Sequence, residues 1–164
     1  MSTWGFYMRK IYLMCGFLGA GKTTVAKQMA SELQNTILLN VDDITVEKHT
    51  PEQLQENWDD CFMAAYEYCW EVIKATPDKD FILDVGFWTK QSRQDAEQRA
   101  SELDNTSSEL VWVVAEPDVM KERVQLRGSP MSKEHILHWD EIYAKFEEPT
   151  HENATIIYTG KIPL

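Results

Sequence analysis

Gly16-Phe-Leu-Gly-Ala-Gly21-Lys22-Thr23 is the stretch of sequence from which the fold can be inferred. It matches G-x-x-x-x-G-K-[ST], the pattern of a phosphate-binding loop, at every fixed position. Glycines let backbone N–H groups turn inward around phosphates, the lysine reaches the β- and γ-phosphate oxygens, and the threonine hydroxyl is a Mg²⁺ ligand. We therefore predict a nucleotide site that takes ATP and Mg²⁺. The residues expected to bind the nucleotide are Gly16, Leu18, Gly19, Ala20, Gly21, Lys22, Thr23 and Thr24.

Apolar runs of strand length alternate with longer helical patterns on both sides of this loop. Such alternation is typical of a parallel sheet covered by helices, with ligands at the carboxyl ends of the strands. Strands are expected at residues 11–15, 36–41, 81–84, 110–114 and 154–158. Helices are expected at residues 21–33, 50–75, 90–103, 117–127 and 133–148. We predict an α/β fold of the P-loop NTPase type, with a five-stranded parallel sheet, helices on both faces and a helical lid, in a single domain spanning residues 1–164.

The composition is that of an ordinary soluble protein, with 43% hydrophobic and 26% charged residues. No apolar run reaches the roughly 18 residues that a membrane span needs. The apolar stretch at 11–20 is interpreted as a strand and its loop, not as a signal peptide, because its glycines fall where phosphate requires them. The three cysteines form no C-x-x-C pair and predict neither a disulfide framework nor a zinc knuckle, so we expect a reducing, cytoplasmic compartment.

The formal net charge is −11, and lysines and arginines are spread singly along the chain. An acidic surface without a basic groove repels phosphate backbones. The charge therefore argues against a nucleic-acid partner. The partners that we expect are ATP and a small-molecule acceptor, and we expect no membrane association.

Carboxylates follow two of the predicted strands, at the sheet edge that carries the phosphate loop. The tetrapeptide N-K-x-D, which reads guanine in GTPase switches, is absent, and Val85 stands where a mechanical ATPase usually has Glu. A kinase instead needs a base that takes the proton of an acceptor hydroxyl. Asp42 is the expected base, with Asp43 left open as the alternative. Asp84 is expected to support Mg²⁺ together with Thr23.

Arg123 and Arg127 lie four residues apart on the helix that ends at Gly128, so they share one face. Both are expected to contact phosphate, and Arg127 is expected to stabilise the transferring group. The break Gly128-Ser-Pro130 and the polar segment after it predict a mobile lid over residues 128–148 that delivers Arg127.

These residues resemble the small P-loop kinases, which include the polynucleotide 5′-hydroxyl kinase domain, chloramphenicol phosphotransferase and zeta toxins. The segments that carry the resemblance are Asn40-Val-Asp42-Asp43-Ile, Asp84-Val-Gly-Phe-Trp-Thr89 with Arg93, Glu122-Arg123-x-x-x-Arg127-Gly128, and Phe146-Glu-Glu-Pro149-Thr150. The resemblance implies that the first aspartate is the base and that both arginines contact phosphate. Polynucleotide kinases carry arginine three positions after that aspartate, whereas this chain has Thr45, which argues against a nucleic-acid 5′ end.

The function predicted from the sequence is transfer of the γ-phosphoryl group of ATP to a hydroxyl of a small molecule, by Lys22, Asp42 and Arg127. Acidic side chains between Glu47 and Asp60 would suit a cationic or polyhydroxylated acceptor. Two alternatives stay open. One is a kinase for a nucleoside, nucleotide or nucleic-acid 5′ end, and the other is a nucleotide-binding regulatory module without an acceptor. The acceptor, the choice between ATP and GTP, and the oligomeric state are not identified by the sequence.

Overall fold

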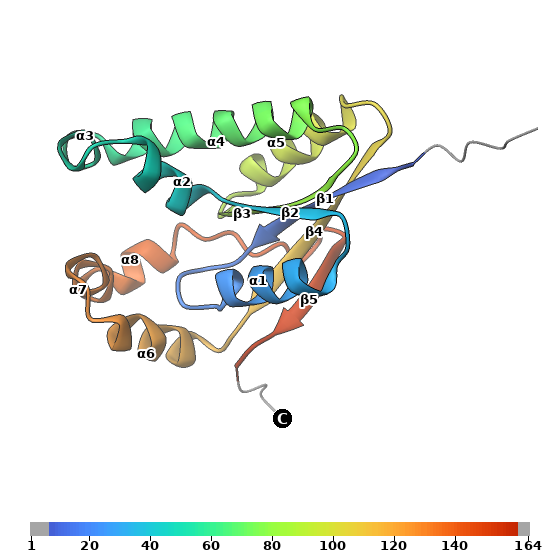
Figure 1. The fold of residues 1–164 in the computed structure, drawn as a ribbon. Coiled ribbons are helices and arrows are strands. Elements are labelled where there is room, and N and C mark those ends of the chain that lie inside the picture. Colours follow the sequence, from blue (N-terminus) through green and yellow to red (C-terminus); the bar gives the residue numbers. More distant parts are fainter. Residues whose placement is uncertain (1–6, 161–164) are drawn as a thin grey trace, which may run out of the picture.

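A sheet of five parallel strands, in the order β2-β3-β1-β4-β5, forms the centre of the molecule (Figure 1). The computed structural model describes residues 7–160. The strands are β1 (Arg9–Cys15), β2 (Thr36–Asn40), β3 (Asp80–Gly86), β4 (Thr106–Val114) and β5 (Ala154–Tyr158). The helices are α1 (Lys22–Glu32), α2 (Val41–Lys48), α3 (Pro51–Glu56), α4 (Trp58–Ala75), α5 (Lys90–Ser101), α6 (Pro117–Arg127), α7 (Pro130–Leu137) and α8 (Trp139–Tyr143). The predicted fold is confirmed.

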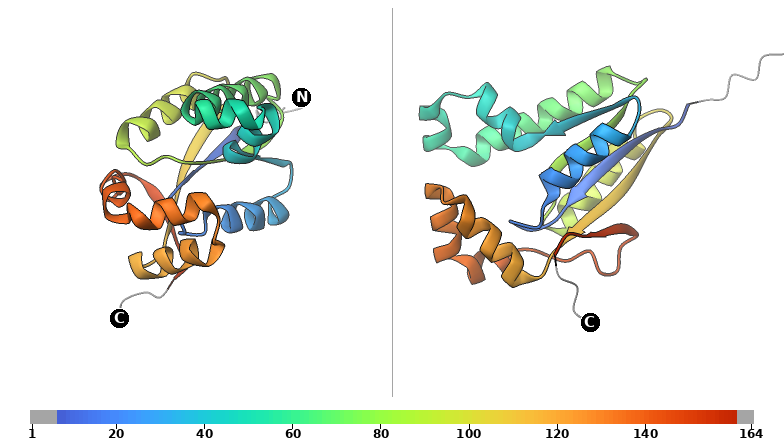
Figure 2. Two further views of the ribbon diagram at one scale, coloured as in Figure 1. Left: turned by 90° about the vertical axis from the view of Figure 1, so that its left-hand side faces the viewer. Right: turned by 60° about the horizontal axis from the view of Figure 1, so that its bottom comes forward.

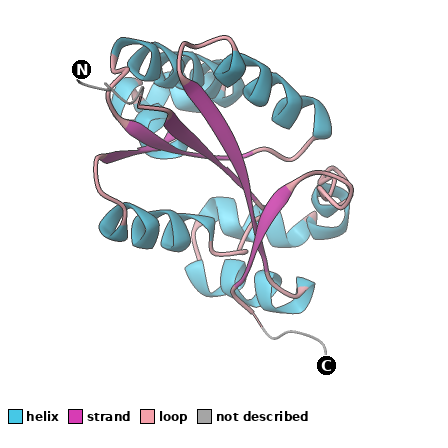
Figure 3. Cartoon of the chain, turned by 90° about the vertical axis from the view of Figure 1, so that its right-hand side faces the viewer, coloured by secondary structure: helices cyan, strands magenta, loops and turns pink. Residues whose placement is uncertain are grey.

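Helices cover both faces of the sheet (Figure 3). The strand side chains alternate between two hydrophobic cores, one on each face. Ile11 and Leu13 of β1 are buried against α4 and α5, whereas Met14 is buried on the face covered by α1 and α6. Both faces are apolar because crossover helices exclude water from each side of a parallel sheet.

Two arms project beyond the carboxyl edge of the sheet (Figure 2). The upper arm consists of α2, α3 and the start of α4, and the lower arm consists of α7 and α8. Because the phosphate loop also emerges at this edge, the arms flank the place where its ligand is expected.

Two helix ends lie where the sequence signals predict them. The Thr50 side chain accepts a hydrogen bond from the Gln53 backbone, and the Gln53 side chain accepts one from the Thr50 backbone, which is a capping box. Helix α6 begins with Pro117 and ends at Gly128, whose left-handed φ of 63° suits glycine.

Three predicted elements need correction. The second strand ends at Asn40, because the Asn40 side chain caps a helix, α2, that starts at Val41. The helix expected over 50–75 is two helices, because Asn57 leaves the helical conformation and caps α4. The helix expected over 133–148 is the pair α7 and α8, followed by loop.

Within residues 7–160, none of the helices has the length and apolar character needed to cross a membrane.

Candidate active site

The loop between β1 and α1 has the backbone geometry that the glycine pattern predicts. Gly19 and Gly21 have φ values of 77° and 96°, which side-chain-bearing residues rarely adopt. A Cβ atom on Gly19 would lie 2.3 Å from the carbonyl oxygen of Met120, so the loop packs closely on α6. The conformation therefore depends on glycine at both positions.

Lys22 is held in a narrow space by two further glycines. A Cβ atom on Gly16 would lie 3.0 Å from Cγ of Lys22, and one on Gly86 would lie 3.8 Å from its Cε. Burial lowers the pKa of Lys22, and the carboxylates of Asp84 and Asp42 oppose that shift. A partly desolvated ammonium group next to two carboxylates is suited to meet phosphate charge.

Thr23 and Asp84 place two hard oxygen atoms side by side. The Thr23 hydroxyl donates a hydrogen bond of 3.0 Å to Oδ2 of Asp84, and Nδ2 of Asn40 donates one of 2.9 Å to the same oxygen. Asp84 is buried, yet its side chain is paired on two sides. Mg²⁺ prefers a few protein oxygens together with phosphate and water, so these residues fit the ion that the sequence predicts.

Asp42 is a second carboxylate, after Asp84, that is electrostatically coupled to Lys22 of the phosphate loop. Although it is open to solvent on one side, enclosure by its surroundings raises its pKa, while Lys22 lowers it and Asp84 raises it further. Asp42 in turn raises the pKa of Lys22. A carboxylate with a raised pKa beside a phosphate-binding lysine has the properties of a general base.

Contrary to the expectation from the sequence, Asp42 and Asp43 do not follow directly on a strand, because β2 ends at Asn40. Both residues lie in the first turn of α2, not on a strand, so they do not point to opposite faces of a sheet. Neighbours on a helix are separated by about 100° around its axis. The Asp43 backbone N–H donates to the Asn40 side chain at 2.9 Å, which fixes this first turn.

The two arginines of α6 have different surroundings. Arg123 is half-buried and donates to the carbonyl oxygens of Gly19 and Ala20 in the phosphate loop. Arg127 is exposed, and its charge lies close enough to Lys22 to lower the pKa of that lysine. Arg127 belongs to α6, before the break at Gly128, so it is not part of the predicted lid.

The model of a known family, described as AAA domain (AAA_33), matches residues 11–149. The chain belongs to this AAA domain family. A comparison with curated proteins found no match.

Solved structures with the same fold as this AAA domain include several kinases. A gluconokinase from Sinorhizobium meliloti 1021 is 17% identical with a TM-score of 0.64, over 93% of this chain and 83% of that one. A shikimate kinase from Bacteroides thetaiotaomicron is 18% identical with a TM-score of 0.54, over 92% and 86%. Kti12 from Chaetomium thermophilum, solved with ADP-AlF3, is 17% identical with a TM-score of 0.63, over 90% and 88%. The fold is thus that of the small P-loop kinases.

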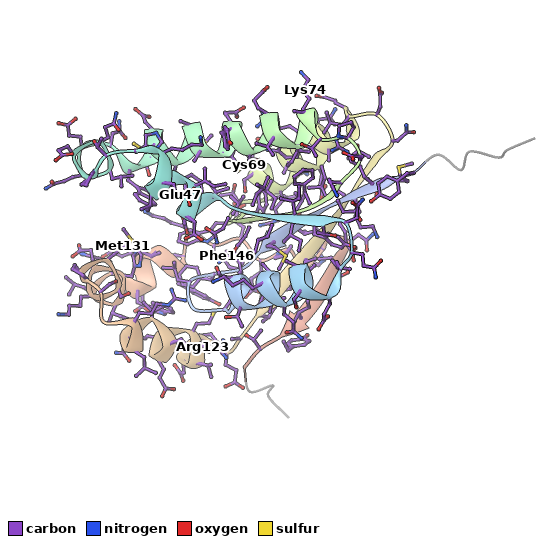
Figure 4. The ribbon with its side chains drawn as sticks, viewed as in Figure 1. Glu47, Cys69, Lys74, Arg123, Met131 and Phe146 are labelled. Carbon is purple, nitrogen blue, oxygen red and sulfur yellow. The ribbon has the colours of Figure 1, made fainter. Side chains whose placement is uncertain are left out.

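The lower arm of the AAA domain is better anchored than its polar sequence suggests. Phe17 of the phosphate loop contacts four aromatic rings, with centroid distances of 4.9 to 5.8 Å. These rings belong to Trp88, Trp139, Tyr143 and Phe146, of which Phe146 is labelled in Figure 4. Of the mobile lid predicted over residues 128–148, α8 and the loop after it are therefore anchored to the phosphate loop by aromatic contacts.

Asn40 and Thr159 take part in the site of the AAA domain but were not predicted. Asn40 joins Asp84 to the start of α2 through its amide and carbonyl groups. Its place directly before two aspartates is the sequence signal of a helix cap. The Thr159 hydroxyl donates a hydrogen bond to the carbonyl of Ala20 in the phosphate loop, 139 residues earlier. No local sequence pattern predicts this contact.

Arg93, which the resemblance singled out, has a supporting position. It is fully buried, donates three bonds of 2.8 to 3.1 Å to the Glu152 carboxylate, and donates one of 2.8 Å to the carbonyl of Phe87. This ion pair ties α5 to the segment before β5 and holds the loop at Gly86, whose carbonyl accepts a bond from Gly16. Arg93 thus stabilises the Gly86–Phe87 segment, which contacts the phosphate loop at Gly16.

Proposed function

We propose that the chain is a kinase that transfers the γ-phosphoryl group of ATP to a hydroxyl group of a small, uncharged or cationic acceptor. The observation that carries this proposal is the arrangement at the carboxyl edge of the sheet. Thr23 of the phosphate loop and Asn40 both bond to Asp84, at 3.0 and 2.9 Å, and Asp42 follows Asn40 in the first turn of α2. In agreement with this arrangement, Lys22 lowers the pKa of Asp42 and Asp42 raises that of Lys22. A nucleotide-binding module without an acceptor would have no hydroxyl proton for this carboxylate to take.

In the proposed reaction the acceptor oxygen forms a bond to the γ-phosphorus while the bond from that phosphorus to the β–γ bridging oxygen breaks. ADP leaves with the electron pair, and Asp42 takes the proton of the hydroxyl. Lys22 and the loop N–H groups hold the phosphates. Thr23 and Asp84 would hold Mg²⁺, which would supply positive charge to the phosphates. Arg127 stabilises charge on the transferring group.

The charge of the upper arm supports the acceptor class. Between Val41 and Phe62 its basic side chains are Lys48 and His49, and both are engaged. Nζ of Lys48 lies 3.7 Å from the centre of the Tyr68 ring, and Nδ1 of His49 is 2.9 Å from the carbonyl oxygen of Thr45. The acidic side chains of the same stretch are Asp42, Asp43, Glu47, Glu52, Glu56, Asp59 and Asp60. An anionic acceptor would meet repulsion on this side of the site.

A kinase for nucleic-acid 5′ ends is less compatible with the upper arm. Thr45 stands where the polynucleotide kinases carry arginine, and here it is fully buried, with its hydroxyl bonded to the carbonyl of Val41 at 2.7 Å. This position of α2 faces the core and not solvent. Lys48, the basic residue of this helix, lies in its last turn, with Nζ 3.7 Å from the centre of the Tyr68 ring.

The test is ADP release from ATP and Mg²⁺ in the presence of three sets of hydroxyl compounds: amino alcohols and aminoglycosides, neutral polyols, and sugar acids or 3′-phosphorylated nucleosides. The Lys22→Ala variant serves as the control for contaminating activity. We expect acceptor-stimulated release with a compound of the first or second set. Stimulation only by the anionic set would contradict the proposed acceptor class, and tight ATP binding without any acceptor effect would favour the regulatory module.

A further inference from the structure

We propose that Arg123 and Thr159 are positioning residues that fix the orientation of the Ala20–Gly21 peptide, and through it the affinity of the phosphate loop for nucleotide. The inference rests on the proposed nucleotide site. It assigns Arg123 a role through the loop and not as a phosphate contact, and it assigns a role to Thr159, which lies beyond the residues 11–149 that match the family.

Both terminal nitrogens of Arg123 are engaged by the back of the loop and the end of β5. Nη1 donates to the carbonyl oxygens of Gly19 and Ala20 at 3.1 and 3.3 Å, and to the Thr159 hydroxyl at 3.0 Å. Nη2 donates to the Thr159 carbonyl at 2.6 Å. The planar guanidinium group presents its donors in a fixed fork, so these bonds define the relative position of three chain segments. Figure 4 labels Arg123 on α6.

Thr159 completes the arrangement from the other side. Its hydroxyl accepts from Arg123 and donates to the carbonyl of Ala20. Its backbone N–H donates to the carbonyl of Val114 at 2.9 Å, which anchors the residue to β4. The position of Thr159 is therefore fixed relative to β4, and its hydroxyl bond fixes the Ala20 carbonyl relative to the same strand.

The geometry of a trans peptide turns these carbonyl contacts into an orientation of N–H groups. The described peptide bonds are all trans, so the N–H of Gly21 points away from the carbonyl of Ala20. Because Arg123 and Thr159 hold that carbonyl on the outer side, the Gly21 N–H faces the inner side, where phosphate is expected. A flipped peptide would point this N–H toward the N–H groups of Arg123, which is unfavourable because both groups are hydrogen-bond donors.

The peptide before Gly21 needs side chains from outside the loop to fix its orientation, because Gly21 is a glycine with a left-handed φ. Glycine populates positive and negative φ about equally, so the peptide before it has little preference of its own. A Cβ atom at Gly21 would lie 3.4 Å from the Thr159 hydroxyl and 3.6 Å from Nη1 of Arg123, so both residues pack directly on the glycine. The freedom that glycine gives the loop is removed by these two side chains.

The first test is the affinity for ADP, measured by calorimetry, of the parent protein and the Thr159→Val variant. Valine keeps the shape of threonine and removes the hydroxyl, which leaves the Ala20 carbonyl without one of its donors. We expect the dissociation constant to rise about tenfold, which corresponds to about 1.4 kcal/mol. Thr159→Ser keeps the hydroxyl and should restore the parent value to within about twofold.

Thr155→Val is the matched control, because Thr155 lies on β5, shortly before Thr159, and its hydroxyl donates a bond of 2.7 Å to the Glu109 carboxylate. Its affinity for ADP should equal that of the parent. With a working acceptor, Thr159→Val should raise KM for ATP and leave kcat nearly unchanged. Arg123→Lys, which keeps the charge but loses the fork, should do the same.

A third readout separates positioning from general stability. The amide resonance of Gly21 in the nucleotide-free protein should shift in Thr159→Val and Arg123→Lys and not in Thr155→Val. Parent-like ADP affinity in Thr159→Val would overturn the proposal. So would Arg123→Lys that lowers kcat at unchanged ADP affinity, since it would place Arg123 on the transferring group. A parent protein that binds no nucleotide would instead overturn the proposed function.

Discussion

The Thr23 hydroxyl lies 3.0 Å from Oδ2 of Asp84, and this contact joins the phosphate loop to the end of the neighbouring strand β3. Asn40 bonds to the same oxygen from β2, at 2.9 Å. Two strands and the loop therefore meet at the Asp84 carboxylate. This carboxylate and the Thr23 hydroxyl are the protein oxygens that would hold Mg²⁺.

Replacing Asp84 tests this assignment. Asp84→Asn keeps the size of the side chain but removes a negative charge next to the expected ion. We expect the Mg²⁺ concentration for half-maximal turnover to rise about 10–100-fold. Asp95→Asn, on the exposed face of α5, is the control and should not differ from the parent. An unchanged Mg²⁺ requirement in Asp84→Asn would remove Asp84 from the metal site.

The phosphate loop itself is tested by Lys22→Ala. The variant removes the charge aimed at the β- and γ-phosphates and leaves the two hydrophobic cores intact. We expect a severe loss of ATP binding or turnover with a cooperative unfolding transition preserved. Lys27→Ala, which removes an exposed lysine from the same helix, should bind ATP as the parent does. Parent-like ATP affinity and turnover in Lys22→Ala would defeat the assignment of the loop.

The base is tested by comparing Asp42→Asn with Asp43→Asn. General-base assistance is worth about 10²–10⁴ in rate, so Asp42→Asn should bind ATP but transfer phosphate more slowly by about that factor. Because the pKa of Asp42 is raised, the acid limb of the parent pH–rate profile should lie above the ordinary aspartate value of 3.8, and it should disappear in this variant. Asp43→Asn should change the rate much less. The reverse ranking would make Asp43 the base.

The raised pKa of Asp42 also has a consequence for stability. The folded protein binds a proton at Asp42 more tightly than the unfolded chain, so the ionised carboxylate costs stability above the folded pKa. That cost vanishes as the pH falls below the ordinary value of 3.8. Asp42→Asn should therefore raise Tm at pH 7, by an amount that shrinks in acid. Asp43→Asn is the control for loss of a carboxylate from the same turn. A lower Tm for Asp42→Asn at pH 7 would contradict the shift.

The lower arm should respond to nucleotide unevenly. Helix α7 follows Gly128 and exposes Met131 and Leu137, whereas Trp139 of α8 is buried against Phe17. A non-hydrolysable ATP analogue should add protection from hydrogen exchange in residues 130–138. Residues 139–146 should be protected before the analogue is added. Equal changes across both segments, or none, would contradict a lid that is limited to α7.

The parts of the structure that the sequence predicts are those with local causes. The phosphate loop, the buried strands and the end of α6 each follow from a pattern of a few neighbouring residues. Helix α2 was missed because Val41 continues the apolar run of β2. Two causes turn it into a helix: the Asn40 cap, which is a local contact with the Asp43 backbone, and the burial of Val41 and Thr45, which depends on tertiary packing.

The candidate site shows the same division. Lys22, Thr23 and Asp84 lie at one edge of the sheet, where the carboxyl ends of parallel strands meet, and their roles stay predictions. The shared face of Arg123 and Arg127 was also predictable, but the partner of Arg123 was not. Its contacts are with residues more than 100 positions earlier and 36 positions later in the chain.

Gly128 lies between helix α6, which contacts the phosphate loop, and helix α7 of the lower arm. Helix α6 before it is tied to the phosphate loop by Arg123, and Arg127 sits about 6 Å further along the same rigid helix. A Cβ atom on Gly128 would meet nothing within 4 Å, so the chain around it is uncrowded. Insertions or deletions beyond this glycine would change α7 and α8 and leave both arginines in place. Under the proposed function, the length of the lower arm can therefore vary without moving the contacts that α6 makes with the phosphate loop.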